Sequence, residues 1–93
     1  MTKKTLSFDK TGISKAPIDK PVVYQIKTGG DKINYIGIAK RGRAQERLAE
    51  HLPNIPGAKV QVTQMTSIKD ARDMETKLVA KHQPKYNTHG VQK

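Results

Sequence analysis

A hairpin pattern in the first half of the chain constrains the fold most strongly. Val22–Lys27 places alternate apolar side chains on one face and is rich in β-branched and aromatic residues, which is typical of a strand. The Gly29–Gly30 pair can adopt the positive φ angles that a two-residue hairpin loop requires, and Lys32–Ile38 returns as a second strand. With that loop, Tyr24 is predicted to lie directly opposite Tyr35 on one face of the sheet.

Three further segments follow, and turn residues separate them. Ala44–Leu52 is predicted to form a short helix, because its apolar side chains recur on one stripe. Lys59–Met65 alternates valines with polar residues and is predicted to form a half-buried strand. Ser67 and Asp70 form a variant of the capping box, and the helix that they open is expected to run to about His82. The order β-β-α-β-α predicts a small domain of the α/β (α+β) class.

The length of the chain, 93 residues, allows one domain with one modest core. Residues 1–20 carry five Lys and two Asp without a usable period, so they are predicted to form a flexible basic N-terminal arm. Residues 21–90 are predicted to be the folded domain, and residues 91–93 a tail.

The charge balance predicts a polyanionic partner. Lys and Arg total 18 against 8 Asp and Glu, a formal net charge of +10, which favours nucleic acid or an acidic membrane surface. No apolar run approaches the roughly 20 residues of a transmembrane helix, so we expect no membrane association. The absence of Cys excludes disulfides and thiolate metal sites, and a cytoplasmic location is the default expectation.

The longest predicted helix carries an acidic residue on its apolar side. The apolar arc of this helix consists of Ile68, Ala71, Met74, Leu78 and Val79. Glu75 falls inside the same arc, where a carboxylate is costly unless it is paired or binds a metal. One interpretation is a buried salt bridge with an Arg. The other is a single inward-facing acid that recruits Mg²⁺ to a phosphate.

The shorter helix and the hairpin supply groups that could work with Glu75. Arg47 and His51 are four residues apart and share one helix face, where Arg suits a phosphate and His can accept a proton near neutral pH. The alternative is a solvated basic flank. Tyr24 and Tyr35 form either a packing pair or two hydroxyls that meet near cations favouring the ionised phenolate.

Basic residues after the second strand predict contact with a phosphate backbone. Lys40, Arg41 and Arg43 form a loop directly before Arg47, although such a run is often solvated surface. In the Lys85-Tyr86-Asn87 tail, the amide could bond a sugar-phosphate or cap the chain end. The predicted nucleic-acid-binding residues are Lys40, Arg41, Arg43, Arg47 and Lys85.

Taken together, these residues resemble a GIY-YIG nuclease domain over residues 21–88. The matching positions are Tyr35-Ile36-Gly37, the tyrosine of Val22-Val23-Tyr24, Arg47, His51, Glu75 and Pro84-Lys85-Tyr86-Asn87. The histidine after the helix arginine is a feature of the homing and restriction branches of the family. Each match alone is weak, but six in order at family-like spacing are specific.

The resemblance implies a three-stranded antiparallel sheet flanked by helices and a metal-dependent endonuclease that uses one Mg²⁺ or Mn²⁺ ion. The implied catalytic residues are Tyr24, Tyr35, Arg47, His51, Glu75 and Asn87. Tyr24 would activate the attacking water with help from His51, and Tyr35 would orient the water or the phosphate. Arg47 would stabilise the charge of the transition state, Glu75 would hold the metal, and Asn87 would steady the site. The expected substrate is DNA, with 5′-phosphate and 3′-hydroxyl products.

Two other functions remain open at this point. The chain could be a non-catalytic module that binds nucleic acid through its basic surface, or a nuclease fold used as a toxin or effector fragment. No zinc finger, recognition helix or aromatic stacking platform is present to specify a sequence. A homo-oligomer, or fusion to a specificity domain, could supply that selectivity.

Overall fold

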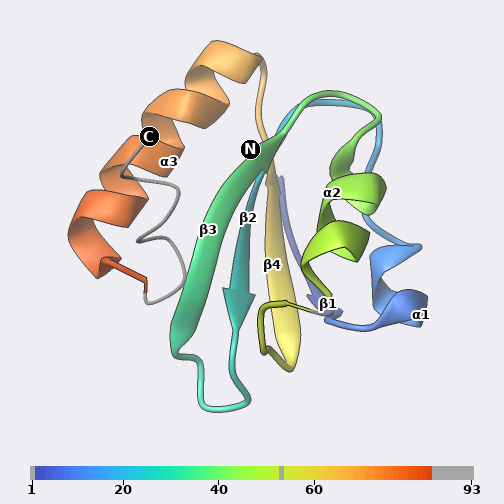
Figure 1. Ribbon diagram of the computed structural model, residues 1–93. Coiled ribbons are helices and arrows are strands. Elements are labelled where there is room, and N and C mark those ends of the chain that lie inside the picture. The colour runs from blue at the N-terminus through green and yellow to red at the C-terminus, as the bar shows by residue number, and fades with distance from the viewer. Residues whose placement is uncertain (1, 53, 85–93) are drawn as a thin grey trace.

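An antiparallel β-sheet with helices on both faces forms the framework of the protein. The computed structural model describes residues 2–52 and 54–84. Its elements, in chain order, are β1 (Thr2–Ser7), α1 (Lys10–Ile13), β2 (Val22–Lys27), β3 (Ile33–Ala39), α2 (Ala44–His51), β4 (Lys59–Gln64) and α3 (Ile68–His82) (Figure 1). Within these ranges the sheet has four strands in the order β1-β4-β2-β3, and every neighbouring pair is antiparallel.

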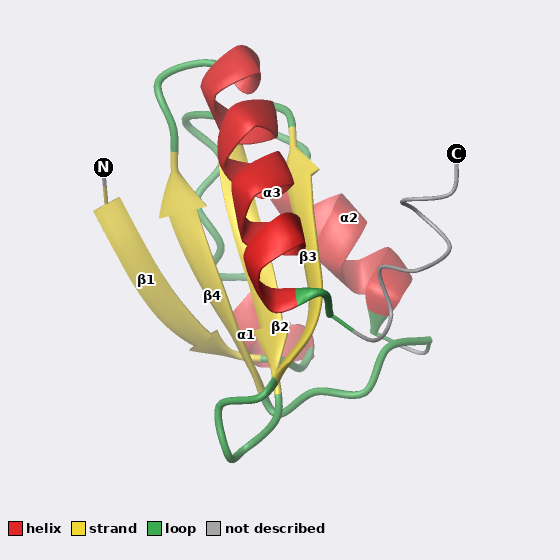
Figure 2. Ribbon diagram, turned by 90° about the vertical axis from the view of Figure 1, so that its left-hand side faces the viewer, coloured by secondary structure: helices red, strands yellow, loops and turns green. Residues whose placement is uncertain are grey.

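The two faces of the sheet carry separate hydrophobic cores. Helices α1 and α2 lie on one face, and α3 packs along β3 and β2 on the other (Figures 1 and 2). The larger core, under α1 and α2, consists of Leu6, Phe8, Ile13, Ala16, Val22, Tyr24, Ile26, Ala39, Ala44, Leu48, Ile55, Val60 and Val62. The smaller core, under α3, is centred on Val23, Ile36, Met65 and Ala71. In residues 2–52 and 54–84, no helix is long and apolar enough to cross a bilayer.

The elements after residue 21 begin and end within one residue of their predicted bounds. The side chain of Ser67, the N-cap of α3, accepts a hydrogen bond from the Asp70 backbone N–H at 3.2 Å, as the capping pattern predicts. The predicted stripe on α2 is also present, since Ala44 and Leu48 are buried and Leu52 packs against the same core. Full burial of a side chain such as Leu48 stabilises the fold by about 1.5–3 kcal/mol.

The prediction of a three-stranded sheet is wrong by one strand. Thr2–Ser7, which the sequence placed in a flexible arm, forms β1 and pairs with β4, so the order of elements is β-α-β-β-α-β-α. Leu6 and Phe8 are buried in the larger core, and this burial fastens the segment to the domain. Lys3 and Lys4 are exposed on this edge strand, which explains the absence of an apolar period. The predicted boundaries of the domain at residue 90 and of the 91–93 tail lie outside the described residues.

The register of the β2–β3 hairpin also differs from the prediction. Tyr24 lies opposite Gly37, and Tyr35 lies opposite Ile26, so the pairing is displaced by two residues. The loop is longer than the predicted Gly-Gly turn, because the Thr28 N–H donates to the Lys32 carbonyl and a bulge follows Ile26. A shift of two residues leaves every side chain on its original face. The two tyrosines therefore still share a face, but as diagonal neighbours.

Gly37 permits the close approach of the two tyrosine rings. A Cβ atom at this position would lie 2.7 Å from Cζ and from the hydroxyl oxygen of Tyr24, and 2.8 Å from Cε2 of Tyr35. Neither ring can move away easily, because Tyr24 is fully buried and Tyr35 packs against the same core. The glycine is therefore required by packing.

We expect Gly37→Ala to lower the free energy of unfolding by about 1–3 kcal/mol, the usual cost of overpacking a core. Gly29→Ala is the matched control, since a Cβ at Gly29 meets nothing within 4 Å. Urea denaturation of both variants measures the difference. Equal stability of the two variants would show that the rings do not confine Gly37.

Candidate active site

Three rings from three elements form a cluster at the α2 face of the sheet. The hydroxyl of Tyr24, on β2, is hydrogen-bonded to Nε2 of His51, on α2, at 2.9 Å. The ring of His51 also lies over Tyr35, on β3, with a centroid distance of 4.6 Å. The centroids of the two tyrosine rings are 6.1 Å apart. The predicted phenol and imidazole groups therefore meet at one place.

Burial controls the protonation of these rings. Desolvation raises the pKa of Tyr24 far above its usual value, the Tyr35 ring adds to this, and the nearby Arg47 charge acts in the opposite direction. Desolvation also raises the pKa of Tyr35. Arg47 favours the ionised phenolate, as the sequence predicted, but burial outweighs this effect on the pKa of both tyrosines. Both phenols are protonated at neutral pH.

His51 is shifted so that it stays neutral. Partial burial lowers its pKa below 6.5, and the positive charge of Arg47 lowers it further, against a smaller opposing effect of Glu50. A neutral imidazole next to a protonated phenol can accept the phenol proton through Nε2. The Tyr24–His51 pair is therefore arranged for proton transfer, and Tyr24 is not permanently ionised.

Glu75 is a half-buried carboxylate, as its place on the apolar arc predicts. Desolvation raises its pKa, and the charge of Arg72, one turn earlier, partly offsets this. In residues 2–52 and 54–84 it takes part in no ion pair or hydrogen bond, so the alternative of a buried salt bridge is not found there. Its negative charge raises the pKa values of Tyr35 and Tyr24, which places it within electrostatic reach of the ring cluster.

The edge strand β3 is where the two faces of the sheet come together. Glu75 belongs to α3 on one face, and the ring cluster lies under α2 on the other, with β3 between the two helices (Figure 1). Because no strand pairs with the outer edge of β3 within the described ranges, groups from both faces can converge there.

The donor set at this edge fits a hydrated divalent ion and not a closed protein cage. Within residues 2–52 and 54–84, no group of three or more His, Cys, Asp or Glu side chains could hold a metal. Mg²⁺ typically keeps several waters and binds through one or two carboxylates together with substrate phosphates. A single unpaired carboxylate such as Glu75 matches that mode of binding.

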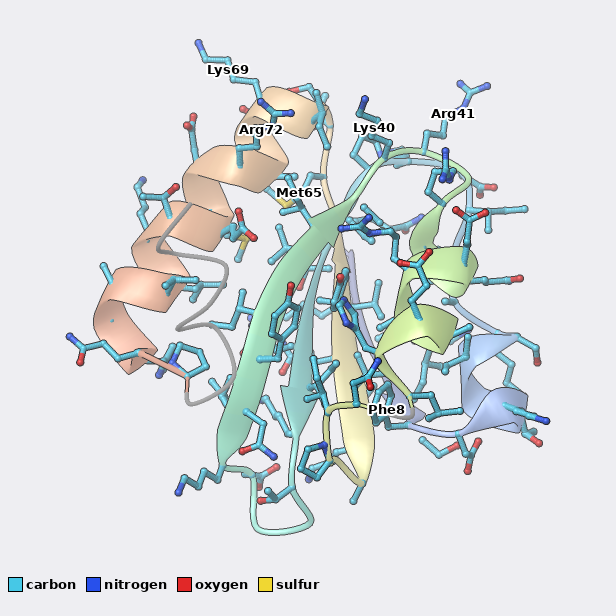
Figure 3. All side chains as sticks on the ribbon, in the orientation of Figure 1. Phe8, Lys40, Arg41, Met65, Lys69 and Arg72 are labelled. Carbon is cyan, nitrogen blue, oxygen red and sulfur yellow. The ribbon has the colours of Figure 1, made fainter. Side chains whose placement is uncertain are left out.

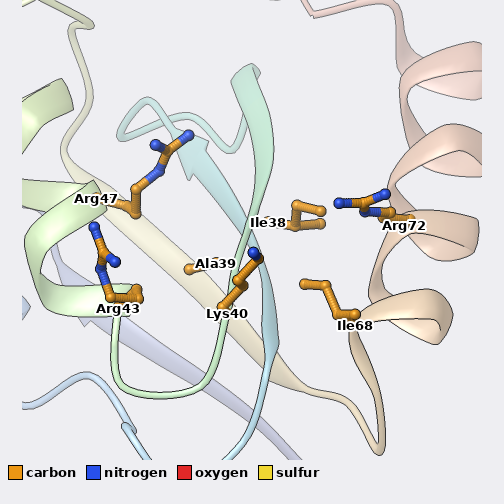
Figure 4. Close-up of a pocket in the computed structure, with 7 residues that line it drawn as sticks. All are labelled: Ile38, Ala39, Lys40, Arg43, Arg47, Ile68 and Arg72. Carbon is orange, nitrogen blue, oxygen red and sulfur yellow. The ribbon is translucent and has the colours of Figure 1, made fainter.

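Three of the predicted basic residues line a pocket of about 330 Å³ between α2 and α3. Lys40, Arg43 and Arg47 contribute to it, and Arg72 joins them from α3 (Figure 4). The Arg47 side chain is exposed, so its guanidinium is accessible from solvent. Arg41 extends outward from the same loop and does not line the pocket (Figure 3).

Two of the predicted site residues cannot be placed, and one basic residue that lines the pocket was missed. Lys85 and Asn87 lie outside the described residues. Arg72 was not predicted from the sequence. Its spacing of three from Glu75 was the available signal, because residues three apart on a helix are neighbours.

Comparisons with known proteins agree with this geometry. No protein-family model matches the chain, and a search of curated proteins finds no match. Among solved structures, the magnesium-bound GIY-YIG N-terminal endonuclease domain of UvrC from Thermotoga maritima is 28% identical, with a TM-score of 0.71 over 85% of this chain and 94% of that one. A point mutant of the same domain, bound to its catalytic divalent cation, is 28% identical with a TM-score of 0.69 over 83% and 91%.

Fold and site together define a small α+β nuclease domain. The chain belongs to the GIY-YIG nuclease superfamily, as the motifs in the sequence predicted.

The lowered pKa of His51 makes stability depend on pH. The unfolded chain takes up a proton at His51 near pH 6.5, before the folded protein does, so the free energy of unfolding should fall as pH drops below about 7. His51→Gln should show a shallower fall between pH 7.5 and 5.5, measured by urea denaturation at each pH. The raised pKa of Glu75 makes the free energy of unfolding change with pH in the opposite direction. Because Glu75 is present in both proteins, the difference between their two pH profiles isolates the contribution of His51.

His82→Gln, at an exposed histidine, is the matched control and should follow the wild-type profile. A wild-type profile that runs parallel to that of His51→Gln would contradict the assignment.

Proposed function

We propose that this protein is a metal-dependent GIY-YIG endonuclease that hydrolyses phosphodiester bonds of DNA and leaves 5′-phosphate and 3′-hydroxyl ends. The observation that carries the proposal is Glu75, a half-buried carboxylate without a partner in the described residues that acts electrostatically on both tyrosines. A purely structural acid at that position would be paired. The catalytic divalent cation in the UvrC domain structures supports a metal-dependent reaction, and the family motif assigns the metal to Glu75.

The hydrogen bond to His51 allows Tyr24 to activate a water molecule. Since Tyr24 is protonated at neutral pH, it accepts a proton from water only as it passes its own proton to Nε2 of neutral His51. The water oxygen forms the new bond to phosphorus, and the bond from phosphorus to the 3′-oxygen breaks. The leaving 3′-oxygen takes a proton from solvent. General base catalysis of this kind contributes about 10²–10⁴-fold in rate.

The neighbouring groups position and stabilise the reacting phosphate. The Arg47 guanidinium offers paired donors to the equatorial oxygens, where negative charge increases in the transition state. Tyr35 holds the His51 ring from one side and presents a second hydroxyl to the water or the phosphate. A divalent ion held by Glu75 would act as a Lewis acid on the phosphate oxygens. Asn87, as a steadying residue, remains a proposal from the motif.

The central test is the isosteric substitution Glu75→Gln. We expect wild-type protein to nick supercoiled plasmid with Mg²⁺ and to stop with EDTA, and Glu75→Gln to lose this activity. The variant should also be at least as stable at neutral pH, because it removes the cost of burying an unpaired charge. Gel assays measure nicking, and thermal denaturation measures stability. Asp73→Asn, at an exposed acid of α3, is the matched control and should cleave normally.

The same assay separates the nuclease from the alternatives. A non-catalytic binding module would retain salt-sensitive binding but leave DNA and RNA intact with Mg²⁺ and with Mn²⁺. Cleavage by Glu75→Gln at the wild-type rate would remove Glu75 from the mechanism. A toxin or effector role requires the same chemistry and differs only in biological context. The use of a single ion, the oligomeric state and a cytoplasmic location stay predictions.

A further inference from the structure

The pocket between α2 and α3 gathers four cationic side chains from three segments of the chain. Lys40 follows β3, Arg43 and Arg47 come from the start of α2, and Arg72 comes from α3 (Figure 4). The apolar side chains of Ile38, Ala39 and Ile68 line the rest of it. In Figure 4 the Arg72 guanidinium extends from α3 toward β3, across the gap from the α2 arginines.

The positive charge in this pocket is poorly compensated. Of these four cations, only Arg43 has an acidic partner in the described part of the chain, Glu46, and that ion pair is exposed on the first turn of α2. No ion pair involves Lys40, Arg47 or Arg72 within residues 2–52 and 54–84. Exposed pairs contribute little to stability, so Arg43 can exchange Glu46 for another anion. Like charges that converge without a counterion favour binding of an anionic group.

The backbone at the pocket adds to the same preference. Arg43 is the N-cap of the eight-residue helix α2, and no side chain caps the first turn of this helix. Ile68 is the first residue of α3. Both helices therefore begin at the pocket, where their N-terminal dipoles favour negative charge.

We propose that this pocket binds a backbone phosphate next to the phosphate that is cut, and that Arg72 is a positioning residue for it. The inference rests on the proposed function. Two residues connect the pocket with the catalytic groups. Arg47 lines the pocket and also acts on Tyr24. Arg72 lines the pocket and lies three residues before Glu75 on α3, so the two are neighbours on the helix. A nucleic acid held at both places would be clamped between α2 and α3 across the edge strand.

Arg72 also acts on Glu75, and the test must separate the two roles. Its charge opposes the desolvation that raises the pKa of Glu75, so a loss of cleavage in an Arg72 variant could come from Glu75 alone. Binding measured without metal does not depend on cleavage. The salt dependence of that binding counts the phosphates that the protein neutralises.

The experiment measures binding of a fluorescent DNA duplex with 5′-hydroxyl ends, in EDTA, over a range of salt concentrations. Log affinity falls as log salt concentration rises, and Arg72→Met should make this fall shallower, by about one in the slope. The same variant should weaken binding on the order of tenfold at low salt. Arg72→Lys should retain most of the slope, since it keeps the charge. Lys69→Met is the matched control, because Lys69 is an exposed cation on the same helix that points away from the pocket (Figure 3).

The outcomes separate this inference from the proposed function. Equal slopes for Arg72→Met and Lys69→Met would overturn the phosphate assignment, even if Arg72→Met failed to cleave. Tighter binding of a 5′-phosphorylated duplex that is lost in Arg72→Met would also overturn it, because the pocket would then hold a terminal phosphate. A reduced slope for Arg72→Met alone supports the pocket. It does so even if no protein in the series cleaves, in which case only the proposed function fails.

Discussion

The contact between Tyr24 and Gly37 across the β2–β3 hairpin is the constraint on which the rest of the site depends. The absence of a side chain at Gly37 leaves room for the Tyr24 and Tyr35 rings beside the sheet. With its ring held there, Tyr24 directs its hydroxyl to His51. His51 in turn packs on Tyr35, so the hairpin and α2 are joined by aromatic contacts and one hydrogen bond. Packing in the core and geometry in the site are thus set by the same residues.

The site also concentrates interactions that oppose stability. Burial shifts Tyr24 and His51 toward their neutral forms, and it makes the charge of Glu75 unfavourable. The arginines next to them have few acidic partners in the described chain. Functional sites commonly keep such groups because chemistry requires them, while the remaining core supplies the stability. Here that core lies on both faces of the sheet, and these site groups gather near the edge strand β3 and the pocket beside it.

The local elements after residue 21 were predictable because each carries its own signal. Val22–Lys27 has the strand period, and Ser67 with Asp70 forms a cap that works as the pattern implies. The first strand was missed because Thr2–Ser7 buries only Leu6 among its described side chains and is otherwise polar, as suits an edge strand with exposed lysines. Its strand conformation comes from pairing with β4, and pairing between distant segments leaves no local pattern.

The sequence by itself determined which chemical groups are present and which helix or strand carries each one. Motif spacing was sufficient to identify the family and to single out Glu75, because a carboxylate on an apolar arc conflicts with its surroundings. Only the tertiary structure decided the hairpin register, the neutral state of the phenols and the place of Arg72 in the pocket. Register depends on loop hydrogen bonds, and protonation depends on burial. Pocket membership depends on how two helices meet across a strand, so all three arise from contacts between segments far apart in the chain.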